Sequence, residues 1–166
     1  MTLFNETTLR VVALGIGATA VMDLWLLLLK ALGVPTLNFT LLGRWVGHMP
    51  HGHWAHAAIA KAPPVPGELA LGWTVHYATG LAFAALLMAW VGPEWLRTPT
   101  LAPALLFGMV TVVLPLFVMQ PAMGAGVASS RTKTPVLNCL KSLGNHSVFG
   151  FGLYVGSLAI SFSAWA

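Results

Sequence analysis

Four long apolar segments alternate with shorter polar ones along the chain. They run approximately over residues 8–32, 68–91, 101–123 and 146–165. Each reaches the length of about 20 residues that a helix needs to cross the hydrocarbon core of a bilayer. Backbone groups cannot go unpaired in lipid, so we expect every segment to be a helix. The pattern predicts an all-α polytopic membrane protein, with residues 1–166 forming a single domain of four transmembrane helices.

The connections between these segments differ in character. Residues 33–67 form a long loop, in which residues 41–60 predict an interfacial helix, and residues 124–145 form a second polar loop. Pro115 and the pair at residues 120 and 121 lie in or near the third segment. Because proline lacks the amide hydrogen of a helical bond, we expect this segment to kink or to end early.

Composition agrees with a membrane protein, and charge predicts its orientation. Hydrophobic residues make up 57% of the chain and charged residues 7%, against roughly 25% charged residues in soluble proteins. No stretch is basic enough for a nucleic-acid partner. Six Lys and Arg residues lie in or beside the two long loops, residues 33–67 and 124–145, and two lie elsewhere. Positive residues stay in the cytoplasm, so we expect both long loops inside and both termini outside.

In this topology, the polar residues of the apolar segments lie at a similar depth, in the cytoplasmic half of the membrane. A carboxylate in a bilayer costs at least a few kcal/mol unless it is paired, protonated or hydrated. We therefore expect Asp23 to face the bundle interior and to pair with His76 or Tyr77. The candidate ligand-binding or proton-binding residues are Asp23, His76, Tyr77, Gln120 and His146, with Arg44 and Arg131 from the loops. Such residues can also serve only to lock helices together, and this alternative stays open.

Histidines gather at residues 47–56, "GHMPHGHWAH", which contains His48, His51, His53 and His56. Imidazoles beside Met49 are ligands for copper, nickel or zinc. No cysteine or carboxylate accompanies them, however, and Trp45 and Trp54 beside them are typical of a membrane interface. The sequence therefore leaves two interpretations, a metal site and an interfacial segment, and favours the second.

Cofactor and catalytic chemistry find little support in the sequence. One haem between His76 and His146 is geometrically possible in a four-helix membrane bundle. The single cysteine, Cys139, excludes a metal site with several cysteine ligands in one chain. Ser-His-Asp spacing, H-E-x-x-H and G-x-S-x-G are absent, so no motif indicates an enzyme.

Several stretches together resemble a family of small bacterial inner-membrane proteins catalogued as domain of unknown function 2938. They are "GIGATAVMDLW" (15–25), "GRWVGHM" (43–49), "PVPGELALGWTVHYATG" (64–80), "MQPAMGAGVASSRT" (119–132) and "HSVFGFGLY" (146–154). The resemblance implies a four-span protein of the bacterial inner membrane, and no activity or site comes with it.

The residues thus lead to three hypotheses of function. The first is binding or movement of a small solute or a proton through a polar cavity open to the cytoplasm, for which a homodimer would supply a wider pathway. The second is a membrane-embedded metal or haem protein. The third is an accessory membrane protein without chemistry, whose partner is the lipid bilayer.

Overall fold

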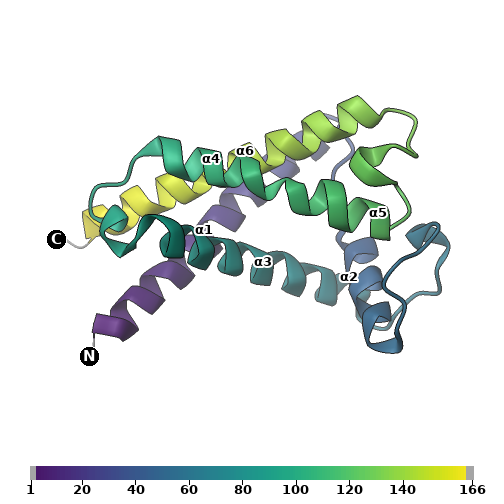
Figure 1. The fold of residues 1–166 in the computed structure, drawn as a ribbon, viewed down its shortest axis with the longest axis horizontal. Coiled ribbons are helices and arrows are strands. Elements are labelled where there is room, and N and C mark those ends of the chain that lie inside the picture. Colours follow the sequence, from purple (N-terminus) through teal and green to yellow (C-terminus); the bar gives the residue numbers. More distant parts are fainter. Residues whose placement is uncertain (1–2, 164–166) are drawn as a thin grey trace. The chain divides into compact units, whose positions relative to one another are not determined.

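The computed structural model describes residues 3–163, with side chains for residues 6–162, and this part of the chain is helical with no strand (Figure 1). Six α-helices follow one another: α1 (Leu3–Ala31), α2 (Phe39–His48), α3 (Glu68–Val91), α4 (Leu101–Thr111), α5 (Gln120–Ala122) and α6 (Pro135–Ser163). Short 3₁₀ turns lie at Met49–His51, Ile59–Lys61, Pro93–Leu96 and Val127–Ser129. The expected all-α class is confirmed.

Within residues 6–162, three helical stretches are long and apolar enough to span a membrane, whereas four were expected. They are Glu6–Ala31, Glu68–Val91 and Leu101–Ala122. The last two residues of the fourth expected segment, 146–165, lie outside the described part of the chain. Its other residues lie in α6, which begins at Pro135, well before His146. Asn145, His146 and several serines interrupt the apolar part of this helix, so it falls below the hydropathy of a spanning segment among the described residues. The three stretches suggest membrane association.

The first long loop holds a helix that is shorter than residues 41–60. Asn38 caps α2, because its Oδ1 accepts hydrogen bonds from the amides of Thr40 (3.0 Å) and Leu41 (3.4 Å). The helix ends at His48, where Pro50 and Gly52 follow. Gly52 has φ +80°, a left-handed conformation that favours glycine, and it closes the 3₁₀ turn after α2.

The third apolar segment is distorted where its prolines predict. After α4, residues Pro115–Met119 form a π-helix, in which the amide of Gln120 donates to the carbonyl of Pro115. Pro115 has no amide hydrogen for the ordinary helical bond, so the helix widens by one residue at this point. The prediction that proline disturbs this segment is confirmed.

The chain divides into two compact units, which we describe separately. The first consists of residues 3–34, 77–111 and 145–163. Its core joins α1, α3, α4 and α6, and its fully buried members include Leu14, Ala84, Leu87 and Leu153. Glycine allows close helix approach here, because a Cβ on Gly80 would overlap the Thr19 hydroxyl.

The second unit consists of residues 35–76 and 112–144. Its α2 packs closely on the start of α3, since a Cβ on Gly43 would overlap the carbonyl of Glu68 and one on Gly72 would overlap that of Phe39. The loop before α3 is tied to the end of α5 by the amides of His56 and Ile59, which donate to the carbonyls of Ala122 (2.7 Å) and Met123 (3.1 Å).

Candidate functional site

In the first unit, the carboxylate of Asp23 is hydrogen-bonded to a tyrosine on another helix. The Tyr77 hydroxyl donates to Asp23 Oδ2 at 2.8 Å. Asp23 lies eight residues before the end of α1 at Ala31, or about 12 Å along the helix axis at 1.5 Å per residue. Both side chains are only partly buried. The expected pairing of these two residues is thus present, within helices that are apolar enough to span a membrane.

His146 forms its contact elsewhere in the first unit, with Thr111 at the end of α4. The distance from Thr111 Oγ1 to His146 Nδ1 is 2.8 Å, and the same hydroxyl donates to the carbonyl of Gly108 at 2.6 Å. A hydroxyl has one hydrogen to donate, so Nδ1 of His146 must be the donor in their shared bond. The neighbouring Asn145 accepts a hydrogen bond from the indole of Trp25 at 3.0 Å.

His76 belongs to the second unit and lies among aromatic rings. Its ring centroid is 4.8 Å from that of Phe39 and 5.8 Å from that of Trp73. Phe39 and Trp73 themselves stack at 4.1 Å. These contacts join the first residue of α2 to one face of α3. The pairing of His76 with Asp23 stays a prediction.

Gln120 directly follows the π-helix and connects three parts of the second unit. Its Oε1 accepts from the Ser129 hydroxyl at 2.8 Å, and its Nε2 donates to Ser142 Oγ at 3.3 Å. Ser129 is buried and has φ +60°. Gln120 therefore holds the loop after α5 against α6. Its role in binding a ligand or a proton stays a prediction.

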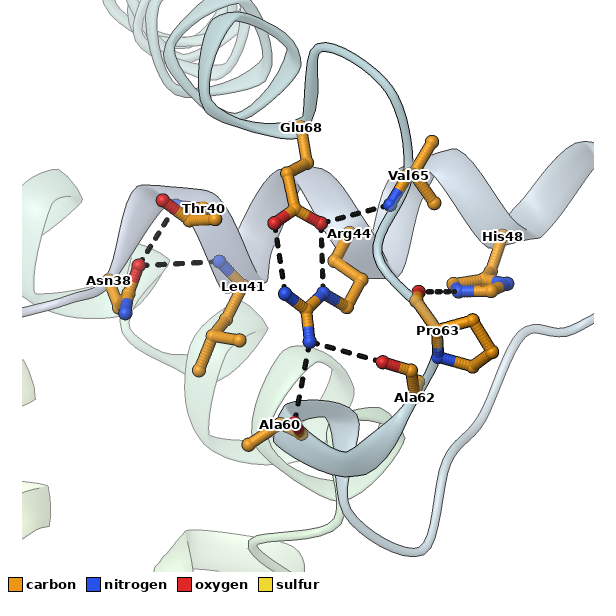
Figure 2. A network of polar contacts seen from close by, with 10 residues as sticks. All are labelled: Asn38, Thr40, Leu41, Arg44, His48, Ala60, Ala62, Pro63, Val65 and Glu68. Carbon is orange, nitrogen blue, oxygen red and sulfur yellow. Dashed lines mark hydrogen bonds and ion pairs between the residues drawn. The ribbon is translucent and has the colours of Figure 1, made fainter.

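Arg44 is the centre of the polar contacts shown in Figure 2. Its Nε and Nη2 donate to the two carboxylate oxygens of Glu68 at 2.8 and 2.9 Å, and its Nη1 donates to the carbonyls of Ala60 (3.4 Å) and Ala62 (3.1 Å). The hydrogen bond to Glu68 raises the pKa of Arg44 above its usual value. This guanidinium therefore joins α2, the loop and the start of α3 to one another.

Arg131 is exposed, and the described residues show no ion pair to it. Its own amide donates to the carbonyl of Ala125, and the amides of Ser129 and Ser130 donate to Gly126 and Val127. These three amides of the loop are therefore already hydrogen-bonded. An anion would meet the Arg131 side chain rather than a set of unpaired amides.

The histidines of residues 48–56 lie near one another, with ring centroids of His48 at 5.1 Å from His56 and 6.2 Å from His53. His48 Nε2 lies 2.9 Å from the carbonyl of Pro63, so this nitrogen carries a hydrogen. Nε2 of His56 is buried without a hydrogen-bond partner. His51 is exposed. Within residues 3–163, no group of three or more His, Cys, Asp or Glu residues is arranged to hold a metal ion.

A family model described as "Protein of unknown function (DUF2938)" matches residues 12–160. The chain belongs to this family. The match confirms the resemblance seen in the sequence and covers both units. Comparison with curated proteins and with solved structures found no match.

Sequence reasoning about this DUF2938 chain missed the partners that hold several candidate residues. They are Thr111 beside His146, Glu68 beside Arg44, Phe39 beside His76, and Ser129 and Ser142 beside Gln120. Glu68 had a usable signal, because an acidic residue at the start of an apolar helix needs a cation. The serines and Thr111 had none, since small hydroxyls are common in such helices.

Proposed function

We propose that this chain is a small inner-membrane protein that binds or moves a small solute or a proton, with Asp23 as its protonatable group. The observation that supports this proposal is the hydrogen bond from Tyr77 to Asp23, between two helices that are apolar enough to span a membrane. An ionisable residue inside such a helix is a candidate functional site by default. Asp23 is only partly buried, as a group that exchanges a proton must be.

The scarcity of carboxylates strengthens the case for Asp23. The chain has four acidic residues, Glu6, Asp23, Glu68 and Glu94. Glu68 is engaged by Arg44 with two hydrogen bonds, whereas Glu94 is exposed in a turn beside Arg97. Asp23 lies away from the ends of a helix that is apolar enough to span a membrane, and the Tyr77 hydroxyl donates a hydrogen bond to it.

Two substitutions separate a protonatable site from a simple lock between helices. Asp23→Asn keeps an acceptor for the Tyr77 hydroxyl but removes the titratable charge. Tyr77→Phe keeps the carboxylate but removes the donor. If Asp23 only locks helices, Asp23→Asn is close to wild type and Tyr77→Phe is destabilised. If Asp23 titrates in function, Asp23→Asn abolishes pH dependence and Tyr77→Phe keeps it with a changed midpoint.

The measurements need no known substrate. Infrared difference spectra between acid and neutral pH report the C=O stretch of a protonated carboxyl, and one such band is expected to disappear in Asp23→Asn. Proton flux into liposomes that contain the protein is followed with an entrapped pH-sensitive dye. The proposal is wrong if the two variants match wild type in both measurements. Cross-linking of the reconstituted protein tests whether the working form is the dimer that a wider pathway would need.

A further inference from the structure

An apolar groove lies in the second unit, with a volume of about 400 Å³. This volume falls within the range of roughly 300–1,000 Å³ found for small-molecule sites. One wall comes from α6, where Val136, Cys139, Leu140 and Leu143 follow one another at helical spacing, and Val112 and Leu116 line it opposite. Among the side chains that line the groove, the Cys139 thiol is polar, and it donates to the carbonyl of Ala128 at 3.2 Å. The lining therefore suits an aliphatic ligand.

The loop beside this groove is held in place by its own hydrogen bonds. Ala128 lines the groove and has φ +49°, and Ser129 follows with φ +60°. Two consecutive non-glycine residues in the left-handed region cost free energy and persist only where neighbouring contacts fix them. Gln120 provides such a contact through its bonds to Ser129 and Ser142. The groove is thus built into the fold of this unit.

The groove opens to the surroundings of the protein along a helix that is suited to a membrane. Val112 and Leu116 belong to the spanning candidate Leu101–Ala122. On α6, Val136 is 73% exposed and Leu140 is 59% exposed. Aliphatic side chains at such exposure are stable when hydrocarbon covers them. In a bilayer, the acyl chains of the lipids supply this hydrocarbon.

Three cations lie close in sequence to residues that line the groove. Arg131 and Lys133 lie between two of its lining residues in sequence, and Lys141 follows Leu140 on α6. The described residues show no ion pair to any of these three cations. The sequence contains no Asp or Glu after Glu94, so no carboxylate of this part of the chain competes for them. Charges of this sign suit an anionic head group.

We propose that this groove binds an anionic phospholipid, with one acyl chain along α6 and the head-group phosphate at Arg131 and Lys133. Basic pockets beside membrane helices bind anionic head groups by the same combination of charge and apolar contact. The site uses neither Asp23 nor Tyr77. Its test is therefore independent of the proposed function.

Native mass spectrometry of the full chain, released from mixed micelles of phosphatidylglycerol and phosphatidylcholine, measures which lipid stays bound. The wild type is expected to retain phosphatidylglycerol in preference. A surface cation contributes about fivefold to binding of anionic lipid, so Arg131→Gln with Lys133→Gln should reduce the preference by about 25-fold. Lys61→Gln, at an exposed lysine of the same unit, is the control and should change nothing.

A second pair of variants tests the acyl-chain contact. Val136→Trp fills the groove and should lower retention of both lipids, whereas Leu137→Trp, at the adjacent exposed residue outside the lining, should not. If Val136→Trp fails to fold, alkylation of the single Cys139 replaces it: phosphatidylglycerol should slow the reaction, and glycerophosphoglycerol, which has no acyl chains, should not.

Three results would overturn the proposal. Equal retention of the two lipids by the wild type removes the head-group preference. Unchanged preference in the double variant removes Arg131 and Lys133 from the site. Protection of Cys139 by glycerophosphoglycerol, or by neither compound, shows that no acyl chain lies in the groove.

Discussion

Gly108 is the position where a single methyl group tests the packing of the first unit most directly. A Cβ at Gly108 would lie 2.5 Å from the carbonyl oxygen of His146 and 2.6 Å from Cα of Gly150. Both are backbone atoms of α6, so no side chain can rotate away. Ordinary van der Waals contact begins near 3.4 Å. Gly108→Ala must therefore push α4 and α6 apart by almost 1 Å.

The expected cost follows from this displacement. Overpacking of a well-packed interior typically costs about 1–3 kcal/mol. The same crossing also positions His146, because Thr111 bonds both His146 and the carbonyl of Gly108. For a chain of this size each kcal/mol lowers the melting temperature by about 2–4 °C. We expect Gly108→Ala to lower it by several degrees, measured by circular dichroism in detergent micelles.

Gly17→Ala is the matched control for this experiment. Gly17 lies within α1 of the same unit, and a Cβ there meets nothing within 4 Å. Alanine is a better helix former than glycine by up to about 1 kcal/mol, so this variant should equal or exceed wild-type stability. The reasoning is refuted if Gly108→Ala has the same melting temperature as Gly17→Ala. That result would mean that α4 and α6 do not meet closely at Gly108.

Two further predictions concern the second unit. Arg44→Lys keeps the charge but loses the paired bonds to Glu68 and those to the loop carbonyls, so amide hydrogen exchange across Phe39–His48 should accelerate several-fold. Arg97→Lys is the control, because the side chains of Arg97 and Glu94 are both more than 70% exposed, and it should leave the exchange rate unchanged. If both variants change the exchange rate equally, the role given to Arg44 is wrong. Burial, together with the neighbouring His48 and His53, lowers the pKa of His56, so the unfolded chain binds a proton more readily than the folded one. The free energy of unfolding should therefore fall as pH drops below about 6.5. This fall should be smaller in His56→Gln and complete in the control His51→Gln. If His56→Gln shows the same pH dependence of stability as wild type, the role given to His56 is wrong.

The helices were predictable because hydropathy alone determines where most of them lie. α3 has the predicted bounds, Glu68–Val91, since a Pro- and Gly-containing stretch precedes it and Gly92 follows it. The disturbance at Pro115 was predictable for the same local reason. The early start of α6 at Pro135 was missed because residues 135–145 are too polar for a spanning segment, although Val136, Cys139, Leu140 and Leu143 follow one another at helical spacing. Helix formation there depends on contacts such as those of Ser142 and Cys139 with the preceding loop.

The candidate site was predictable only where placing a charged group in an apolar helix costs enough free energy to require a partner. A carboxylate in an apolar helix needs a donor, and Tyr77 provides one to Asp23. The same argument gave no partner for Gln120 or His146, because an amide or an imidazole can be satisfied by any nearby hydroxyl. Their partners, Ser129 and Thr111, depend on where a strained loop and a glycine crossing bring the backbone. Tertiary geometry of that kind leaves no period in the sequence.

The hydrogen bond between Tyr77 and Asp23 is compatible with both a lock and a site, and the two make different demands on the residue at position 23. A lock needs an acceptor for one hydroxyl, and asparagine supplies it at a smaller desolvation cost than a carboxylate. For the bond from the Tyr77 hydroxyl alone, a carboxylate is therefore the more costly choice. The cost has a physical reason if the charge itself is used, as the ligand of a proton or a cation. That is why Asp23→Asn, which preserves the geometry and removes only the charge, carries more information than any alanine substitution at the same position.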